Sequence, residues 1–234
     1  MQDLKTYSVA APAPVRLEGR YVVVEPFARA EHGQALWDGL GGDGANGEGG
    51  VNEALRFFPG DDFSGVEAFC DWLESANASG SLITHIFRSK ADGAIVGMAS
   101  LMRPDPKNGV VEVGSVAHGP AMKRSPLSTE AHYLLARHVF EDLGYRRYEW
   151  KCHNENEPSK VTARRYGFTF EGVFRQHIIS KGRNRDTAWF SIIDAEWSVV
   201  KAGYEAWLAP ENFDADGRQK KRLDDIRAEL GTTA

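Results

Sequence analysis

One carboxylate interrupts an otherwise apolar run, VVEVGSVA, over residues 110–117. In such surroundings Glu112 would be partly removed from water, which favours the neutral acid and suits the side chain to act as a general base near neutral pH. A base of this kind takes a proton from a nucleophile, directly or through a water molecule. Two interpretations remain open. Glu112 performs this proton transfer, or it faces outward or pairs with an arginine in a structural role.

Positive charges and hydroxyl groups gather where a helix is predicted to begin. Ser125 has the residue type of an N-cap, and Pro126 suits the first helical position, where its missing N–H costs nothing. The free N–H groups and the dipole of a helix start favour anions. The segment therefore predicts a phosphate site, and the alternative is a plain helix start flanked by surface cations. The candidate phosphate-binding residues are Lys123, Arg124, Ser125, Pro126, Leu127, Ser128 and Thr129.

Neither the cysteines nor the histidines have the spacing of a metal site. Cys70 and Cys152 are far apart in the sequence, and two reduced thiols are the simplest interpretation. Cys152 ends a predicted strand, where a single thiol is more often part of the core than a nucleophile. His118, His153 and His177 lie near predicted strand ends without a ligand set around them. We predict no metal and no covalent catalysis by cysteine.

The elements that would position these residues alternate between strands and helices. Strands 81–88, 94–102 and 109–117 follow one another through short turns and should form an antiparallel meander. A helix then separates 109–117 from the next strand, 147–152, so these two should be parallel neighbours. Further strands are expected at 21–27, 168–174 and 187–194, and helices at 31–40, 66–76, 126–143, 159–166, 195–208 and 218–230.

The glycine-rich segment 39–50 could suggest a phosphate-binding loop. No strand leads directly into it, and it contains neither a GK[ST] nor a GxGxxG pattern. A surface loop is the better interpretation.

Composition excludes several classes of protein. The chain has 234 residues and a formal net charge of −5, which argues against non-specific binding to nucleic acid. No apolar run is long enough to span a membrane, and the first residues lack the pattern of a signal peptide. A cytoplasmic location is therefore the expectation.

Three stretches occur in a characteristic order: VVEVGSVAHGPAMKRSPLSTEA (110–131), YEWKCHNENEPSKVTARRYGFTFEGVFRQH (148–177) and GRNRDTAWFSIID (182–194). Together they resemble the GNAT superfamily of acetyltransferases. Within it the chain is similar to the branch that contains the Rim-type ribosomal-protein N-terminal acetyltransferases.

The resemblance covers about residues 15–195 and implies an α/β (α+β) fold. The expected sheet is mixed and mostly antiparallel, is splayed at a central parallel strand pair, and is flanked by helices. We therefore expect a GNAT domain over 1–195 and a helical C-terminal extension over 196–234.

The chain departs from the family at the loop that binds the pyrophosphate of coenzyme A. The family pattern is usually [QR]-x-x-G-x-[GA], whereas this sequence reads KRSPLS over 123–128. Pro126 and Ser128 replace both glycines, which otherwise let the backbone approach the phosphates closely.

The resemblance implies direct transfer of an acetyl group from acetyl-CoA to a primary amine, without an acyl-enzyme intermediate. The acceptor would be a small molecule or the N-terminus of a peptide or protein. In this scheme Glu112 is the base, and Ser159 is a candidate acid for the thiolate or a helix cap. The tyrosine that many relatives use as the acid falls on Ala163, while Tyr166 reads as a core residue. The splayed strand with Ser115 and Val116, and the loop with Asn154, Asn156 and Ser159, would hold the pantetheine arm.

The acceptor would contact aromatic and cationic side chains, although core packing explains the aromatic residues equally well. The acceptor-site candidates are Phe57, Phe58, Phe63 and Trp189, with a cationic run of Arg175, Lys181, Arg183 and Arg185 that suits an anionic or aromatic acceptor.

Three other functions stay open: a non-catalytic acyl-CoA-binding module, a peptide-recognition scaffold, and detoxifying acetylation of aminoacyl-nucleotide-like compounds. The segment 197–207 could pack on its own domain or form a homodimer.

Overall fold

A computed structural model describes residues 4–44 and 49–231, so part of the glycine-rich segment lies outside the described residues. Within these ranges, eight strands form one sheet in the order β1-β2-β3-β4-β5-β6-β8-β7. Among these described strands, β5 and β6 are the one parallel pair, and the other neighbours are antiparallel. The mixed sheet with a central parallel pair is therefore confirmed. The strands are β1 Leu17–Glu18, β2 Val22–Pro26, β3 Leu82–Ser89, β4 Ile95–Asp105, β5 Val110–His118, β6 Arg147–His153, β7 Thr169–Ser180 and β8 Arg183–Ile193.

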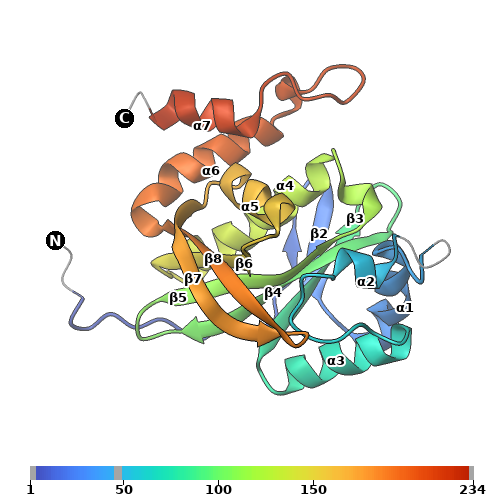
Figure 1. Ribbon diagram of the computed structural model, residues 1–234. Coiled ribbons are helices and arrows are strands. Elements are labelled where there is room, and N and C mark those ends of the chain that lie inside the picture. Colours follow the sequence, from blue (N-terminus) through green and yellow to red (C-terminus); the bar gives the residue numbers. More distant parts are fainter. Residues whose placement is uncertain (1–3, 45–48, 232–234) are drawn as a thin grey trace.

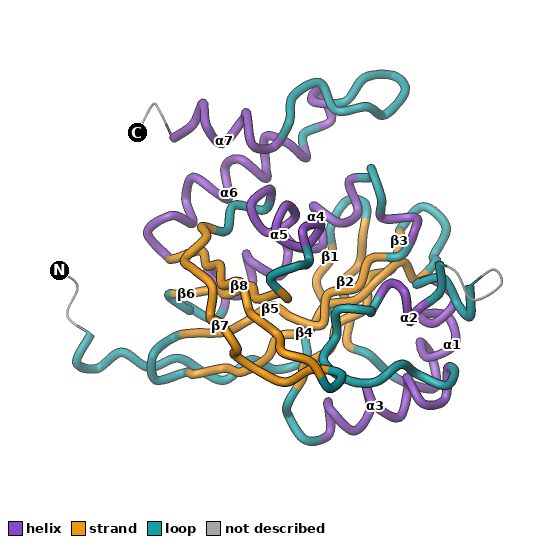
Figure 2. Tube along the Cα trace, in the orientation of Figure 1, coloured by secondary structure: helices purple, strands orange, loops and turns teal. Residues whose placement is uncertain are grey.

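Helices cover both faces of the sheet. Figure 1 shows α1, α2 and α3 on one side and α4, α5 and α6 on the other, and the tube in Figure 2 gives the same layering. Two buried apolar clusters correspond to these two layers. Within the described residues, no helix is long and apolar enough to cross a membrane. The helices are α1 Arg29–Gly39, α2 Val51–Ala54, α3 Val66–Ala78, α4 Pro126–Arg137, α5 Glu157–Arg165, α6 Asp194–Leu208 and α7 Leu223–Gly231, with short turns η1 Pro120–Met122, η2 His138–Asp142 and η3 Pro210–Asn212.

Helix α4 crosses from β5 to β6 and buries the stripe that the sequence predicts. Ala131, Leu134 and Leu135 are buried in the larger core against the sheet. A π-helical turn, η2, continues α4, and Gly144 ends the segment with φ of 70°. This left-handed conformation suits glycine, as expected for a helix end.

The hairpin β7–β8 is longer than the sequence predicts. The expected strands 168–174 and 187–194 extend to Ser180 and back to Arg183. Most β7 side chains are exposed, so the outer part of the hairpin lacks the apolar alternation on which strand prediction depends. The last helix also differs: α7 begins at Leu223 rather than at 218.

The C-terminal segment packs on the rest of the chain. Trp197, Val200 and Tyr204 of α6 belong to the same buried cluster as the residues of α4. Tyr133 of α4 donates a hydrogen bond to Glu205 of α6 at 2.9 Å. Helix α7 lies on α6, as Figure 1 shows.

His85 of β3 is fully buried, and this makes the fold sensitive to acid. Its Nε2 accepts a hydrogen bond from the Val15 backbone N–H at 3.3 Å. Burial, with a smaller contribution from His138, lowers the pKa of His85 to about 4. The unfolded chain takes up this proton near its ordinary value of 6.5, whereas the folded protein resists it. The stabilisation from neutral His85 is therefore complete above about pH 6.5 and is lost as the pH falls toward about 4.

We expect His85 to contribute about 2 kcal/mol to the loss of unfolding free energy between about pH 7 and about pH 5. Urea unfolding at the two pH values measures this loss, and His85→Gln should show a smaller one than the wild-type protein. His177→Gln, on the exposed strand β7, serves as the control. An equal loss in wild-type protein and His85→Gln would contradict the assignment.

Candidate active site

The parallel strands β5 and β6 separate part-way along their length. Their pairing runs from Val110↔Arg147 to Val113↔Trp150 and stops there. The register between β4 and β5 then shifts, and Ser115 has φ of 48°, which is unusual for a residue other than glycine. One extra residue on β5 forms a bulge that bends the strand away from β6. A pocket of about 590 Å³ opens at this point.

Glu112 lines this pocket and is paired with two cations. Its carboxylate is 2.7 Å from Nη1 of Arg103 and 3.0 Å from Nζ of Lys151, and only 4% of its side chain is exposed. Lys151 also reaches Glu149 at 2.8 Å and lies over the ring of Trp189 at 3.9 Å. Glu112 is thus buried as expected, but it is not an isolated carboxylate. The arginine pair foreseen as the structural alternative is present in the same pocket.

Ser159 lines the same pocket, close to the start of α5. Its Oγ accepts a hydrogen bond from the indole N–H of Trp150 at 3.0 Å. An indole only donates, so the hydroxyl hydrogen of Ser159 is free to point to another acceptor. The backbone N–H of Ser159 donates to Oδ1 of Asn156 at 3.1 Å, so Asn156 caps α5. The alternative that Ser159 is itself the cap is therefore wrong.

Cys152 lines the same wall as Ser159. Burial raises the pKa of its thiol, and the neighbouring Ser159 hydroxyl opposes part of that shift. A buried thiol with a raised pKa stays protonated near neutral pH, so it is a poor nucleophile.

The start of α4 is an uncapped helix terminus. Ser125 occupies the N-cap position, but its Oγ donates to the carbonyl of Met122 at 3.1 Å and caps no helical N–H. Pro126 and Ser128 lie inside the first helical turn, and the left-handed conformation before the helix falls on Arg124, with φ of 56°. The loop therefore reaches the helix without needing the φ freedom of glycine at 126 or 128. Lys123 and Arg124 are exposed, and neither forms an ion pair with the described residues.

Thr129 does not face this helix terminus. It is fully buried, and its Oγ1 accepts a hydrogen bond from Nη1 of Arg165 at 2.8 Å. Leu127 is half-buried and packs against the larger core. Of the predicted phosphate-binding residues, the structure thus places Lys123 to Pro126 and Ser128 near the free helix end, and turns Thr129 and Leu127 inward.

Known proteins share both this sequence and this architecture. Residues 51–169 match the family model described as an acetyltransferase (GNAT) domain. A crystal structure of a GCN5-related N-acetyltransferase from Brucella melitensis is 44% identical, with a TM-score of 0.88, and the match covers 96% of this chain and 99% of that one. The chain belongs to the GNAT acetyltransferase family. The resemblance seen in the sequence and the expectation of an acyltransferase are confirmed.

Two further relatives of this GNAT acetyltransferase show how far the likeness extends. A structure described as "probable acetyltransferases (GNAT family)" from Chromobacterium violaceum is 33% identical, has a TM-score of 0.75, and covers 85% of this chain and 96% of its own. "Putative ribosomal N-acetyltransferase YdaF" from Bacillus subtilis is 29% identical over 110 residues. That match spans 47% of this GNAT protein and 60% of the length of the curated relative.

The predicted acceptor residues of this GNAT acetyltransferase divide into two groups. Phe57 and Phe58 line the pocket, and the Phe57 ring lies 5.5 Å from that of His153. Phe63 instead packs on Phe69, with ring centroids 5.3 Å apart, in the smaller core. Trp189 supports Lys151 and is not among the residues that line the pocket. Phe63 thus has the core placement that was the alternative interpretation, whereas Trp189 is half-buried and its ring lies 4.5 Å from that of the exposed Phe174.

The residues predicted to hold the pantetheine arm also fall into two groups. Ser115, Val116, Asn156 and Ser159 line the pocket, whereas Asn154 does not. Its backbone N–H donates to the carbonyl of Asp186 at 2.9 Å and so joins the end of β6 to β8.

Sequence reasoning missed Arg103, Lys151 and Trp150. In β6, Lys151 alternates with Trp150, so only one of them would be expected to face any one side of a regular sheet. At the point where β5 and β6 diverge, both side chains reach the pocket. Arg103 follows the predicted apolar strand 94–102. Its φ of 48° and its contact with Glu112 depend on a bulge that the sequence does not reveal.

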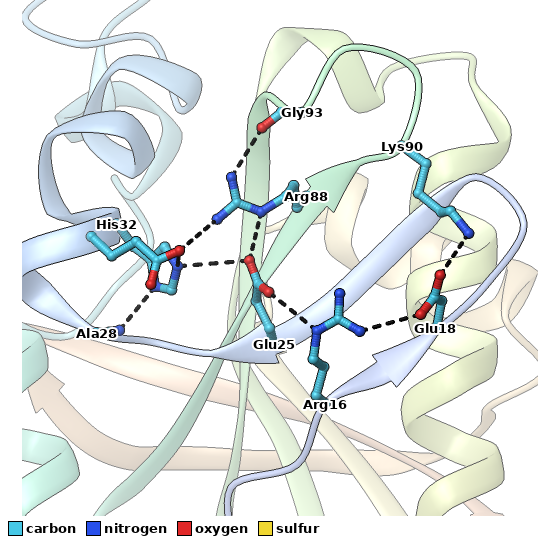
Figure 3. Close-up of polar contacts among 9 residues, drawn as sticks. Arg16, Glu18, Glu25, Ala28, His32, Arg88, Lys90 and Gly93 are labelled. Carbon is cyan, nitrogen blue, oxygen red and sulfur yellow. Dashed lines mark hydrogen bonds and ion pairs between the residues drawn. The ribbon is translucent and has the colours of Figure 1, made fainter.

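A second cluster, remote from the pocket, is an ion-pair network. Among the described residues, the group that brings His, Asp, Glu or Cys ligand atoms close enough to share a metal ion is Glu25, Glu31 and His32. Arg88 already pairs with Glu25 at 2.6 Å and with Glu31 at 3.4 Å, as the contacts in Figure 3 show. Nδ1 of His32 accepts the N–H of Ala28 at 3.0 Å, so a neutral ring directs its Nε2 proton toward the carboxylates. These contacts suit an ion-pair network better than a metal site.

Proposed function

We propose that this GNAT acetyltransferase transfers an acetyl group from acetyl-CoA to a primary amine of a small molecule or a peptide N-terminus. Transfer would be direct, within a complex that holds both substrates. The observation that carries this proposal is that Glu112 and Ser159 line one pocket, at the point where β5 and β6 diverge. A carboxylate that can accept a proton and a hydroxyl that can donate one thus face the same space.

The start of α4 suits a diphosphate. The N–H groups of Leu127 and Ser128 belong to the first helical turn and have no partner within the helix. The helix dipole adds to the attraction for an anion, and Lys123 and Arg124 supply two positive charges. When bound there, acetyl-CoA supplies an activated acetyl thioester.

The side chains of the pocket divide the remaining chemistry between them. Glu112 accepts a proton from the attacking amine, directly or through water, while the new carbon–nitrogen bond forms and the carbon–sulfur bond breaks. Trp150 holds Ser159 as an acceptor, so the Ser159 hydroxyl can donate a hydrogen bond that stabilises the leaving thiolate. Lys151 and Arg103 hold the Glu112 carboxylate in place through their two ion pairs.

Release of free thiol from acetyl-CoA in the presence of a panel of primary amines tests the proposal. A thermal-unfolding series with coenzyme A is recorded alongside it. Amine-dependent thiol release together with stabilisation by coenzyme A supports the proposal. Stabilisation without turnover on any amine would favour an acyl-CoA-binding module, and no stabilisation would favour a scaffold that binds no coenzyme.

A further inference from the structure

Arg185 is a cation in the pocket without a balancing carboxylate. It comes from β8, lines the pocket, and donates from Nη1 to the backbone carbonyl of Phe57 at 3.1 Å. Its Nε is buried and has no hydrogen-bond partner in the described part of the chain. No ion pair joins Arg185 to any carboxylate of residues 4–44 or 49–231. Burial lowers the pKa of this guanidinium and the charge of Arg103 adds to the shift, while Cys152 and Glu112 oppose part of it.

The other two cations of the pocket already have partners. Arg103 pairs with Glu112, and Lys151 pairs with both Glu112 and Glu149. Of the three, Arg185 is thus the cation without a direct ion pair among the described residues. A partly buried guanidinium without a counter-ion is unfavourable, and a carboxylate with its two oxygens is the group that it binds best.

The place of Arg185 along the sheet sets how far such a carboxylate would lie from the reacting amine. In the strand register, Glu112 of β5 pairs with Glu149 of β6, and Glu149 pairs with Ser191 of β8. Arg185 precedes Ser191 by six positions, which corresponds to about 20 Å along the strand. Both side chains line the same pocket but start from positions this far apart, so an amine at Glu112 and a carboxylate at Arg185 would belong to different parts of one acceptor.

We propose that the acceptor is an amine that also carries a carboxylate several bonds away, with the amine at Glu112 and the carboxylate at Arg185. This inference rests on the proposed acetyl transfer and specifies its acceptor. An acidic amino acid and a peptide with an acidic second residue both have this chemistry. In each case the carboxylate supplies the missing counter-ion and an acceptor for the unpartnered Nε.

The test compares carboxylate acceptors with their carboxamide counterparts, which have nearly the same shape. Glutamate is paired with glutamine, and the dipeptide amide Ala-Glu-NH2 with Ala-Gln-NH2. We expect kcat/KM of the wild-type protein to favour the carboxylate in at least one pair by about 10-fold or more, mainly through KM. The pair with the larger ratio identifies the acceptor as an amino acid or a peptide.

Arg185→Gln should bring that ratio close to unity, so that the carboxylate and the carboxamide of each pair react with similar kcat/KM. Arg185→Lys keeps the charge but loses Nε, and should retain an intermediate preference. Arg218→Gln, on the exposed C-terminal segment, is the matched control and should retain the wild-type ratio. Thermal unfolding of each variant verifies that it folds.

A ratio near unity in the wild-type protein, or a preference that survives in Arg185→Gln, would overturn the inference. Calorimetric titration with the same pairs separates this failure from failure of the proposed function. If no amine is acetylated, tighter binding of the carboxylate that is lost in Arg185→Gln still supports the inference, and equal binding of the two members of each pair contradicts it.

Discussion

Glu112→Gln is expected to lower kcat for amine acetylation by about 10²–10⁴-fold, because a positioned general base contributes on that scale. Glutamine keeps the shape of the side chain but cannot accept the amine proton at neutral pH. The KM for acetyl-CoA should change little, since the proposed diphosphate site lies at the start of α4. Initial rates of thiol release at neutral pH, over a range of amine and acetyl-CoA concentrations, measure the effect.

Glu149→Gln is the matched control for this substitution. Glu149 shares Lys151 with Glu112, at 2.8 Å, but does not line the pocket. Removing its charge disturbs the same ion-pair network without removing the proposed base. A large loss in both variants would mean that the network acts through structure alone. Full turnover of Glu112→Gln across neutral pH would remove Glu112 from the mechanism.

Glu130→Gln is expected to reduce the free energy of unfolding by about 3 kcal/mol, the largest effect on stability that we anticipate. The buried Glu130 carboxylate accepts the backbone N–H groups of Arg20, Tyr21 and Val22 at 2.8, 2.6 and 2.8 Å. Hydrogen bonds to a charged group are stronger than neutral ones, and an amide nitrogen in place of one oxygen leaves an N–H facing an N–H. Urea unfolding at neutral pH measures the loss.

The neighbourhood of Glu130 supplies a second variant and a control. A Cβ atom added at Gly19 would lie 2.4 Å from the Glu130 carboxylate, so Gly19→Ala should destabilise the protein in the same direction. Glu211→Gln, an exposed carboxylate on η3, should stay within about 0.5 kcal/mol of the wild-type protein. A Glu130→Gln protein as stable as this control would show that the three hydrogen bonds contribute little.

The contact of Glu130 also shows what sequence could and could not predict about the fold. The helix at Pro126 and its apolar stripe follow from local spacing, and so does the parallel pairing of its flanking strands. Glu130 reads only as a polar residue in that stripe, because the three N–H groups that it binds lie more than a hundred positions earlier in the chain. The outer half of the β7–β8 hairpin escaped prediction for a different reason, since its exposed side chains carry no alternation.

The residues of the pocket also divide into those that the sequence could predict and those that it could not. Glu112 and Ser159 could be selected from residue type and resemblance, and the structure brings both to one cavity. The cations beside Glu112 could not be selected, because their positions depend on bulges at Arg103 and Ser115 that no local pattern indicates. Phe63 shows the converse difficulty, since a ring that could line a pocket is indistinguishable in sequence from a ring that packs against a core.

A crystal structure with coenzyme A bound tests the central claim most directly. The account predicts the diphosphate on the backbone N–H groups of Leu127 and Ser128, close to Lys123 and Arg124. It places the sulfur beside Ser159, in the gap between 110–118 and 147–153 where Glu112 lies. Coenzyme bound elsewhere with the start of α4 empty, or no binding in crystals and in calorimetry, would contradict it.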